Sequence, residues 1–392
     1  MNGLPIARLL GIEIRVSVAW MVLIALITFL GAEQAVLTAP GLARPVQWLI
    51  GLAIALGFLA TVVAHELAHA LVGRRMGVPT SGIVLGFLGG TAPMSIQARQ
   101  PGGELAIAAA GPIVSALVAL IALPFGFATG SGVGTGELAA LSGALFVIGG
   151  LNAIFAGLSL LPGMPLDGGR IVRAIAWAGT GDQDRASRIT VRIGRGLGWM
   201  LIGSAIVLAL ADLVVGGLLV LGIGWLLQTG ASALSGRIEV ERLVRGSVVR
   251  DAITREVPTL VPNLTVDTFA ERFTGEDRVS ALPVVDGETV LGVVGVRQLQ
   301  RLPRNRHASK RAADLMVAPP VAPFLAPEDE LWPAIDLMNR IGVDGLAVVV
   351  DGRLEGMVMR ESIGALMVRK GAALDGGTSE VPSRRWPRRR GP

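Results

Sequence analysis

The stretch Val46–Gly73 reads VQWLIGLAIALGFLATVVAHELAHALVG, and it decides how the rest of the chain is interpreted. Its first nineteen residues carry no charge, so they are long and apolar enough to cross a bilayer as a helix. His65, Glu66 and His69 follow directly. Because positions i and i+4 share one face of a helix, His65 and His69 can bind the same metal ion. Glu66 can then serve as general base for a water molecule at that metal.

The composition indicates an integral membrane protein with two or three domains. Of the 392 residues, 52% are hydrophobic and occur in long runs, and the mean hydropathy is +0.61. All 35 basic residues except Lys310 and Lys370 are arginine, and they gather in the loops beside the apolar runs and near the C-terminus. Membrane topology accounts for this distribution, so we expect no nucleic-acid partner. The absence of cysteine excludes disulfides and Cys-ligated metal sites.

Six apolar runs predict six transmembrane helices within residues 1–236, a polytopic α-helical domain. The predicted spans are Val16–Gly31, Val46–Gly73, Leu105–Leu123, Leu138–Leu161, Gly196–Ala211 and Leu213–Leu227. Arginines favour one side of the membrane at every crossing, whereas the loops on the other side hold only Arg44. The positive-inside rule therefore predicts a multi-pass protein of the cell membrane with both termini in the cytoplasm. No removable signal peptide is expected at Met1–Arg15.

Two short stretches between the spans predict backbone that is not helical. Residues 11–16 alternate polar and apolar side chains, which indicates a strand at the membrane surface. Gly89 and Gly90 lie in a glycine-rich, strand-like segment, which indicates an exposed backbone edge or a re-entrant loop.

From Arg237 onward the composition becomes charged and alternating, and the chain repeats itself. The segments 283–287 and 347–352 match, as do two further pairs of segments, at an offset of 63–65 residues. Each copy predicts strands that end in Asp-Gly turns, together with a helix. We therefore expect an α/β tandem unit at residues 237–370, with repeats at about 246–302 and 309–369. Residues 371–392 predict a disordered basic tail.

Two histidines leave a catalytic zinc site incomplete, because such sites keep three protein ligands and one open position. The chain has three histidines, and the third, His307, lies in the repeat unit. The third ligand is therefore expected to be a carboxylate. Asp167 is the best candidate, because it follows an apolar span and lies on the same predicted side of the membrane as His69. The alternative for Asp167 is an ordinary aspartate in a Pro-Gly turn.

These residues carry a family resemblance. Thr61–Gly73 and Ser159–Arg170 together resemble the site-2 proteases, the polytopic intramembrane zinc metalloproteases of peptidase family M50, in the branch that carries a C-terminal pair of CBS domains. The matching segments are His65–His69, Gly86–Ala92, Ala110–Pro112 and Leu160–Gly169. The resemblance implies one Zn²⁺ per chain held by His65, His69 and Asp167, with Glu66 as catalytic base.

The resemblance also implies a substrate class, namely single-span transmembrane proteins. A transmembrane helix must unwind before hydrolysis, and the Gly89-Gly90 edge can hold the unwound strand by β-addition. Simple turn geometry is the alternative for these two glycines. The family usually has Asn eight residues before the ligand Asp, where this chain has Ser159. The chain has no tyrosine, so zinc itself, Ser159, Asn152 or a backbone group is left to stabilise the oxyanion. For Asn152, a hydrogen bond between helices is the alternative.

The tandem repeat resembles a CBS pair whose ligand remains open. Members of that family that bind adenosine nucleotides often carry Thr or Ser followed three residues later by Asp. The corresponding positions here are Gly295 and Gln298 in the first copy, and Met359 and Ser362 in the second. An adenine nucleotide, a homodimer through the CBS domains and a purely structural module therefore stay as alternatives.

The leading hypothesis is an intramembrane zinc endopeptidase with a cytosolic CBS pair as its regulatory or dimerising unit. A CBS-gated transporter or channel is the first alternative, with the histidines and Asp167 forming an ion site. A pseudoprotease scaffold that binds transmembrane helices without cutting them is the second. Glu66 beside paired histidines favours hydrolysis, because a permeation path has no need of a general base.

Overall fold

The structure is a computed structural model that describes residues 3–78, 82–86, 89–90, 98, 100–130, 137–270 and 279–374. The chain divides into two compact units, Met1–Gly236 and Arg237–Pro392.

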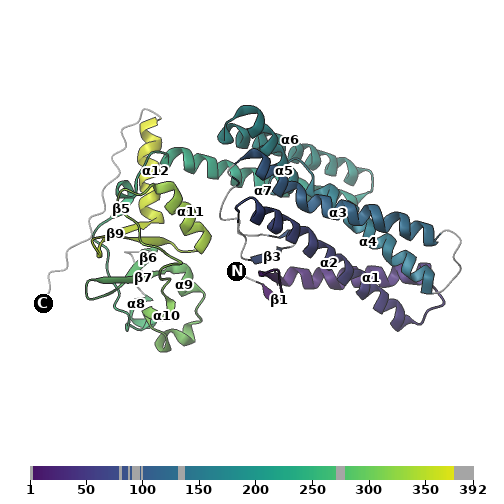
Figure 1. Ribbon diagram of the computed structural model, residues 1–392, viewed down its shortest axis with the longest axis horizontal. Coiled ribbons are helices and arrows are strands. Elements are labelled where there is room, and N and C mark those ends of the chain that lie inside the picture. The colour runs from purple at the N-terminus through teal and green to yellow at the C-terminus, as the bar shows by residue number, and fades with distance from the viewer. Residues whose placement is uncertain are drawn as a thin grey trace. The chain divides into compact units, whose positions relative to one another are not determined.

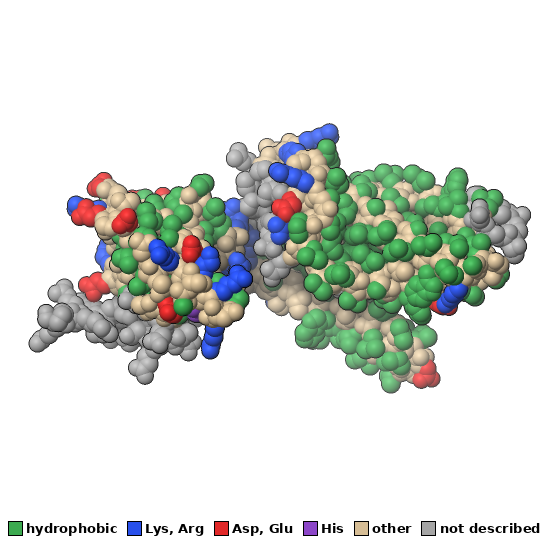
Figure 2. Space-filling model, turned by 90° about the horizontal axis from the view of Figure 1, so that it is seen from below, with side chains coloured by type: hydrophobic (Ala, Val, Ile, Leu, Met, Phe, Trp, Pro, Cys, Tyr) green, Lys and Arg blue, Asp and Glu red, His purple; other side chains and the backbone are tan. Residues whose placement is uncertain are grey.

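The first unit is built mainly from helices (Figure 1). They are α1 (Val18–Thr38), α2 (Arg44–Arg75), α3 (Pro101–Gly130), α4 (Glu137–Ser159), α5 (Asp167–Thr180), α6 (Gln183–Leu210) and α7 (Val214–Val244). All of them except α5 are long and apolar enough to cross a membrane, which gives six candidate spans among the described residues. Hydrophobic side chains cover most of the face of this helical unit that Figure 2 shows. The prediction of a polytopic α-helical membrane protein is confirmed.

A small sheet precedes and follows the first two helices. Its strands are β1 (Leu4–Leu9), β2 (Ile12–Val16), β3 (Gly82–Gly86) and β4 (Gly89–Gly90), in the order β1-β2-β3-β4. Strand β2 pairs antiparallel with β1 and parallel with β3, and β3 pairs antiparallel with β4. The alternation in residues 12–16 is thus that of a strand with one buried face. Gly89-Gly90 forms the last strand of the sheet among the described residues.

The core of the first unit surrounds the middle of α2. Ile54, Phe58 and Val62 are buried there, against Trp20 of α1 and Leu85 of β3. This packing covers α2 just before its histidines, so both histidines lie in the buried part of a helix.

The helices differ from the predicted spans in ways that have physical causes. Helix α6 begins at Gln183, well before the predicted start at Gly196, because the Asp182 carboxylate caps it by accepting the backbone N–H groups of Asp184 and Arg185. Helix α5 was not predicted, since its arginines were interpreted as loop charges. It ends at Gly181, whose φ of 68° suits glycine and stops the helix.

The second unit contains two similar halves. The first holds β6 (Ala281–Asp286), β7 (Thr289–Gly295) and α9 (Val296–Gln300), and the second holds β8 (Gly345–Val350), β9 (Arg353–Met359) and α12 (Arg360–Leu374). Each half has an antiparallel hairpin, β6–β7 or β8–β9, and both hairpins have a register shift at the same relative position. The remaining elements are η1 (Val249–Ala252), β5 (Ile253–Thr254), α8 (Val266–Ala270), η3 (Arg304–Ser309), α10 (Ala312–Leu315) and α11 (Leu331–Ile341).

One hydrophobic core serves both halves of the second unit. It includes Leu282 and Val294 from the first hairpin and Leu346 and Val358 from the second. Asp344 is buried between the halves and forms ion pairs with Arg297 of α9 and with Arg360 of α12, both at 3.1 Å.

The C-terminal end differs slightly from the expectation of a tail that begins at residue 371. Helix α12 continues to Leu374, so residues 371–374 belong to it. Residues 375–392, the rest of the predicted tail, lie outside the described residues.

Candidate metal centre

His65, His69 and Asp167 come together in one cluster, with candidate ligand atoms all within 4.8 Å of one another. The Nε2 atoms of the two histidines are 3.2 Å apart. Asp167 Oδ2 lies 3.4 Å from His65 Nε2 and 3.3 Å from His69 Nε2. Both histidines are buried, and Asp167 is partly buried. Three atoms that can each hold a metal thus point at one small volume.

Two helices from distant parts of the chain supply these side chains. One turn of α2 separates His65 from His69, so both rings leave the helix on the same side. Asp167 is the first residue of α5 and not part of an isolated turn. Gly169 follows it closely, where an added Cβ would lie 2.5 Å from the carbonyl carbon of Gly163. The glycine therefore lets the chain before α5 pack tightly and fixes where α5 begins.

The surroundings of Asp167 favour the ionised form of its carboxyl group. Burial by itself would raise the pKa of this carboxyl group, but hydrogen bonds to His65 and His69 outweigh it and hold the pKa well below its ordinary value. The group is therefore ionised at neutral pH, as a metal ligand must be.

The Nδ1 atom of each histidine ring, the nitrogen that faces away from the cluster, also has a hydrogen-bond partner. His69 Nδ1 lies 2.7 Å from the backbone carbonyl of Ile107, and His65 Nδ1 lies 2.9 Å from Ser115 Oγ. A carbonyl oxygen can only accept a hydrogen bond, so His69 Nδ1 carries the proton. In the neutral ring, Nε2 then carries the lone pair and can serve as a ligand atom for a metal ion.

Gly111 of α3 lies directly beside the Nε2 atoms of both histidines. A Cβ at this position would lie 2.5 Å from His65 Nε2 and closer still to His69 Nε2. Glycine at this position therefore keeps a side chain away from both imidazole nitrogens. Two imidazoles and a carboxylate form a donor set of a catalytic zinc site. The residues present therefore fit zinc.

Charged groups next to the cluster belong to α2, α3 and α5. Glu66 is buried on α2 and lies near enough to His69 and to Arg170 to interact with both electrostatically. Glu104, in the first turn of α3, is 1% exposed and accepts a hydrogen bond from Arg173 Nε of α5 at 2.8 Å. The second helix of the site is thus tied to α3 by a buried ion pair.

Comparison with known proteins decides the family. The model of peptidase family M50 matches residues 53–144, and the model of the CBS domain matches residues 249–304 and 312–366. Rip3 of Mycobacterium tuberculosis is 32% identical to this chain over 352 residues, which are 90% of this chain and 89% of Rip3. The chain belongs to peptidase family M50.

One further relative and one solved structure are also similar to this M50 protein. The protein sll0528 of Synechocystis is 28% identical over 367 residues, which cover 92% of this chain and 94% of sll0528. The solved site-2 protease from Methanocaldococcus jannaschii aligns with a TM-score of 0.40 and 24% identity, over 60% of this chain and 95% of that one. The names of Rip3 and sll0528 both contain the words zinc metalloprotease. The M50 protein is a zinc metalloprotease of the site-2 protease family with a CBS pair.

The side chains of Asn152 and Ser159, which were also predicted for the site of this M50 protease, form hydrogen bonds to backbone carbonyls. Asn152 is 0% exposed, its Nδ2 donates to the Ile148 carbonyl at 2.9 Å, and its Oδ1 has no hydrogen-bond partner among the described residues. Ser159 Oγ donates to the Ala156 carbonyl at 3.0 Å. Within the described ranges, no printed hydrogen bond joins either side chain to the cluster. Gly89 and Gly90 form β4 of the sheet.

The sequence did not indicate several residues that surround the cluster of His65, His69 and Asp167. Ser115, the Ile107 carbonyl and Glu104 all come from α3, and Phe155 of α4 packs on the His65 ring with ring centroids 4.8 Å apart. One signal was available, since Glu104 is an acidic residue at the start of an otherwise uncharged span. Nothing in the sequence indicates which face of α3 meets the histidines.

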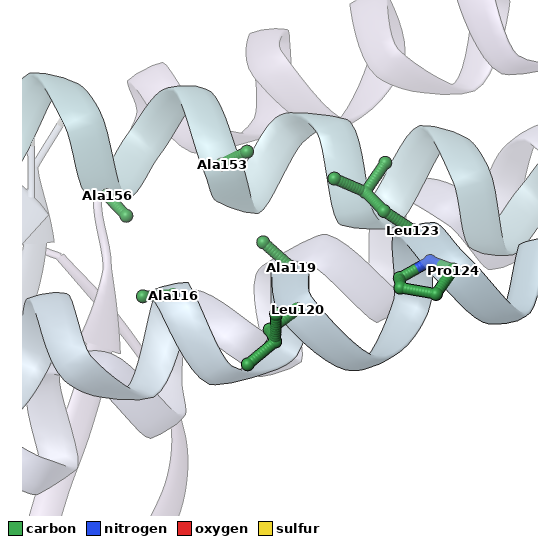
Figure 3. A pocket seen from close by; sticks show the side chains of 7 residues that line it. All are labelled: Ala116, Ala119, Leu120, Leu123, Pro124, Ala153 and Ala156. Atoms are coloured by element: carbon green, nitrogen blue, oxygen red, sulfur yellow. The ribbon is translucent and has the colours of Figure 1, made fainter.

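An apolar groove lies between α3 and α4 of the M50 protease (Figure 3). Its volume is about 360 Å³, and its lining side chains are Ala116, Ala119, Leu120, Leu123, Pro124, Ala153 and Ala156. None of these side chains can be a metal ligand or exchange a proton. The groove therefore offers no side chain for hydrolysis.

Proposed function

We propose that this M50 protein is an intramembrane endopeptidase that hydrolyses peptide bonds in or near the transmembrane segments of single-span membrane proteins. The observation that carries the proposal is the meeting of His65 and His69, in the later half of an apolar helix long enough to span a membrane, with Asp167. Ionisable groups at such positions cost free energy unless they are used, about 2.5–3.5 kcal/mol for a charged residue at the centre of a bilayer. A substrate within the membrane would meet this cluster.

In this proposal, His65, His69 and Asp167 hold one zinc ion per chain. When bound, zinc would supply Lewis acidity toward a water molecule and toward the peptide carbonyl. The protonated Nδ1 of His69 leaves Nε2 free as a ligand atom, and the ionised Asp167 supplies the negative charge. Gly111 keeps any side chain of α3 away from the two Nε2 atoms, so it leaves them accessible to the ion.

Glu66 is the proposed proton carrier. Its carboxylate takes a proton from the attacking water and then gives it to the leaving amine, as general acid–base catalysis requires. The burial of Glu66 on α2, one residue after His65, supports this role. The positive charge of Arg170 lies near enough to Glu66 and Asp167 to interact with both carboxyl groups electrostatically.

Substrate binding is proposed at the sheet. The outer edge of β4, at Gly89-Gly90, has no partner strand among the described residues, so its backbone groups can pair with an unwound substrate segment. The oxyanion partner stays a choice between zinc, backbone, Asn152 and Ser159. Asn152 can donate to an oxyanion only through Nδ2, one hydrogen of which already bonds to the Ile148 carbonyl, whereas its Oδ1 can accept from a substrate N–H. The Ser159 hydroxyl already donates to the Ala156 carbonyl.

The CBS pair is proposed as a cytosolic regulatory or dimerising unit. The two matches to the CBS domain and the single core that joins both halves support a tandem module. An adenine nucleotide is the proposed small-molecule ligand. Calorimetry on the purified full-length protein with ATP and AMP tests this point, and no heat at millimolar nucleotide removes the nucleotide from the proposal. Sedimentation of the same sample tests the dimer.

The main experiment measures zinc and cleavage in the same samples. Purified wild-type protein is expected to contain about one zinc per chain and to cut a model single-span substrate in detergent or in vesicles. Glu66→Gln is expected to keep its zinc and to lose cleavage by several orders of magnitude, because the proton carrier is gone while the three ligands remain. Full proteolysis in Glu66→Gln would show that the assigned role of Glu66 is wrong.

A further inference from the structure

Helix α3 supplies no metal ligand, yet it contacts every segment that does. Ile107, Gly111 and Ser115 are four residues apart and so form one stripe along α3. The two ends of the stripe meet the outer nitrogens of His69 and His65, and the middle of the stripe faces the Nε2 atoms. The spacing of the stripe therefore matches the spacing of the histidines on α2.

Ser115 is the residue of this stripe that contacts a histidine through its side chain, so a substitution can remove the contact. It is 0% exposed, and its Oγ lies 2.9 Å from His65 Nδ1. His65 Nε2 faces His69 and Asp167, so its lone pair is needed for the metal. The proton of a neutral imidazole must then be on Nδ1, which makes Ser115 Oγ the acceptor. Without that acceptor, the ring loses both its favoured tautomer and its orientation.

Glu104 extends the same stripe by one turn toward the N-terminus of α3. Its Oε1 accepts hydrogen bonds from both Nε and Nη2 of Arg173, and the Glu104 side chain is 2% exposed while that of Arg173 is 11% exposed. Arg173 lies on α5, six residues after Asp167. A short helix that is tied at this point cannot rotate or slide without breaking a buried ion pair. Glu104 thus fixes the direction in which Asp167 leaves its helix.

We infer that α3 is the template of the zinc site, in which Ser115 and Glu104 are positioning residues that set the orientations of His65 and Asp167. The inference rests on the proposed ligand set of His65, His69 and Asp167. It assigns neither residue any contact with substrate. Each acts through another side chain, Ser115 through His65 and Glu104 through Arg173.

The test measures zinc affinity of the purified full-length protein by competition with a chelator, separately from proteolysis. Ser115→Ala is expected to weaken zinc binding 10–100-fold, as the loss of a group that orients a metal ligand generally does. Ser115→Thr keeps the hydroxyl group and is expected to retain most of the affinity. Cobalt substitution adds a spectroscopic readout, because a changed ligand orientation alters the visible absorption bands of the bound ion.

Ser142→Ala is the matched control, since Ser142 is also a buried serine in an apolar helix and donates to the Gly126 carbonyl. If Ser115 has only a packing role, Ser115→Ala and Ser142→Ala will lower the thermal stability of the metal-free protein alike and leave zinc affinity and the cobalt spectrum unchanged. That result overturns the inference for His65. A selective loss of zinc affinity in Ser115→Ala supports it.

Glu104→Gln tests the second half, with Glu33→Gln as its control. Glu33 forms an exposed ion pair with Arg44, which lies about 30 Å along α2 from His65. Glu104→Gln is expected to weaken zinc binding about tenfold, and Glu33→Gln to leave it unchanged. Equal affinities in the two variants overturn the role of Glu104. A wild-type protein that binds no zinc would instead contradict the proposed ligand set, so the two failures are distinguishable.

Discussion

Trp20 Nε1 donates a hydrogen bond to the backbone carbonyl of Gly86 at a distance of 2.7 Å. The bond joins α1 to the end of β3, at the residue that pairs with Gly89 of β4. The same indole ring lies 6.3 Å from Phe58, which lies 6.2 Å from Phe155, which in turn packs on His65. A continuous row of rings therefore runs from the proposed substrate-binding edge to His65, a proposed metal ligand.

Trp20→Phe should lower kcat/KM for a transmembrane substrate about tenfold and leave zinc affinity unchanged. The substitution keeps an aromatic ring but leaves the Gly86 carbonyl without its donor, a loss worth about 1–3 kcal/mol at a buried group. Steady-state cleavage and chelator competition measure the two quantities. Trp48→Phe is the control, because the Trp48 ring packs against Phe29 far from the sheet. A zinc affinity that fell together with activity would contradict a role at the substrate edge.

Gly111→Ala should abolish zinc binding while the protein still folds. The added methyl group occupies the space among the ligand nitrogens, and the rings must turn away from each other to admit it. Gly102→Ala on the same helix meets nothing within 4 Å and should bind zinc as the wild type does. Metal analysis after gel filtration provides the measurement. A Gly111→Ala protein with normal zinc content would mean that the ion binds elsewhere.

Asp167→Ala and Asp167→Asn should both lose most of their zinc, because each removes the one anionic donor of the cluster. Asp212→Asn is the control, since Asp212 lies in a left-handed turn between α6 and α7 where asparagine is equally at ease. Zinc content per chain, determined on the same preparations, decides the outcome. Normal zinc in both Asp167 variants would remove Asp167 from the ligand set.

Asp344→Asn should destabilise the CBS pair and leave zinc binding intact. Asp344 is buried and a hydrogen bond to a charged group is worth about 1.5–3 kcal/mol, whereas the two arginines that lose their partner are 43% and 36% exposed and can be solvated. Glu288→Gln also breaks an ion pair between the two halves, with Arg353, but both side chains there are more than 70% exposed and little change is expected. Hydrogen exchange of the full-length protein over residues 279–374 reports the difference. Equal exchange in the two variants would contradict a structural role of Asp344.

The proposed topology can be tested with single cysteines, because the chain has none of its own. Gly41→Cys lies between α1 and α2, and Glu288→Cys lies in the CBS pair. With cytoplasmic termini, a membrane-impermeant maleimide should label Cys at position 41 in intact cells, and position 288 only after permeabilisation. The reverse pattern would invert the predicted orientation.

The sequence allowed six apolar helices and a CBS pair to be predicted because both depend on local patterns. Apolar length defines the spans, and the offset of the two hairpins defines the pair. The i, i+4 spacing of His65 and His69 is equally local. Asp167 was selected by exclusion of cysteine and of His307 and by its place after an apolar span on the predicted side of His69, but its position as the first residue of a helix was not predicted.

The residues that were missed are those whose role depends on packing between helices. Ser115 and Ile107 matter because one face of α3 lies against α2, and no spacing within α3 reveals which face that is. Glu104 and Arg173 lie 69 residues apart and become partners only when α5 forms. The helical state of α5 was hidden because its arginines resemble those of a cytoplasmic loop.

The single core that joins the two CBS copies has a consequence for how such a chain can be shortened. Leu282 and Leu346, from equivalent strands, are both completely buried in that core. A chain truncated between the copies would present one of these surfaces to water. Such a chain could bury that surface again by packing it against the same repeat of a second molecule. The loss of one repeat would therefore favour association of the chains.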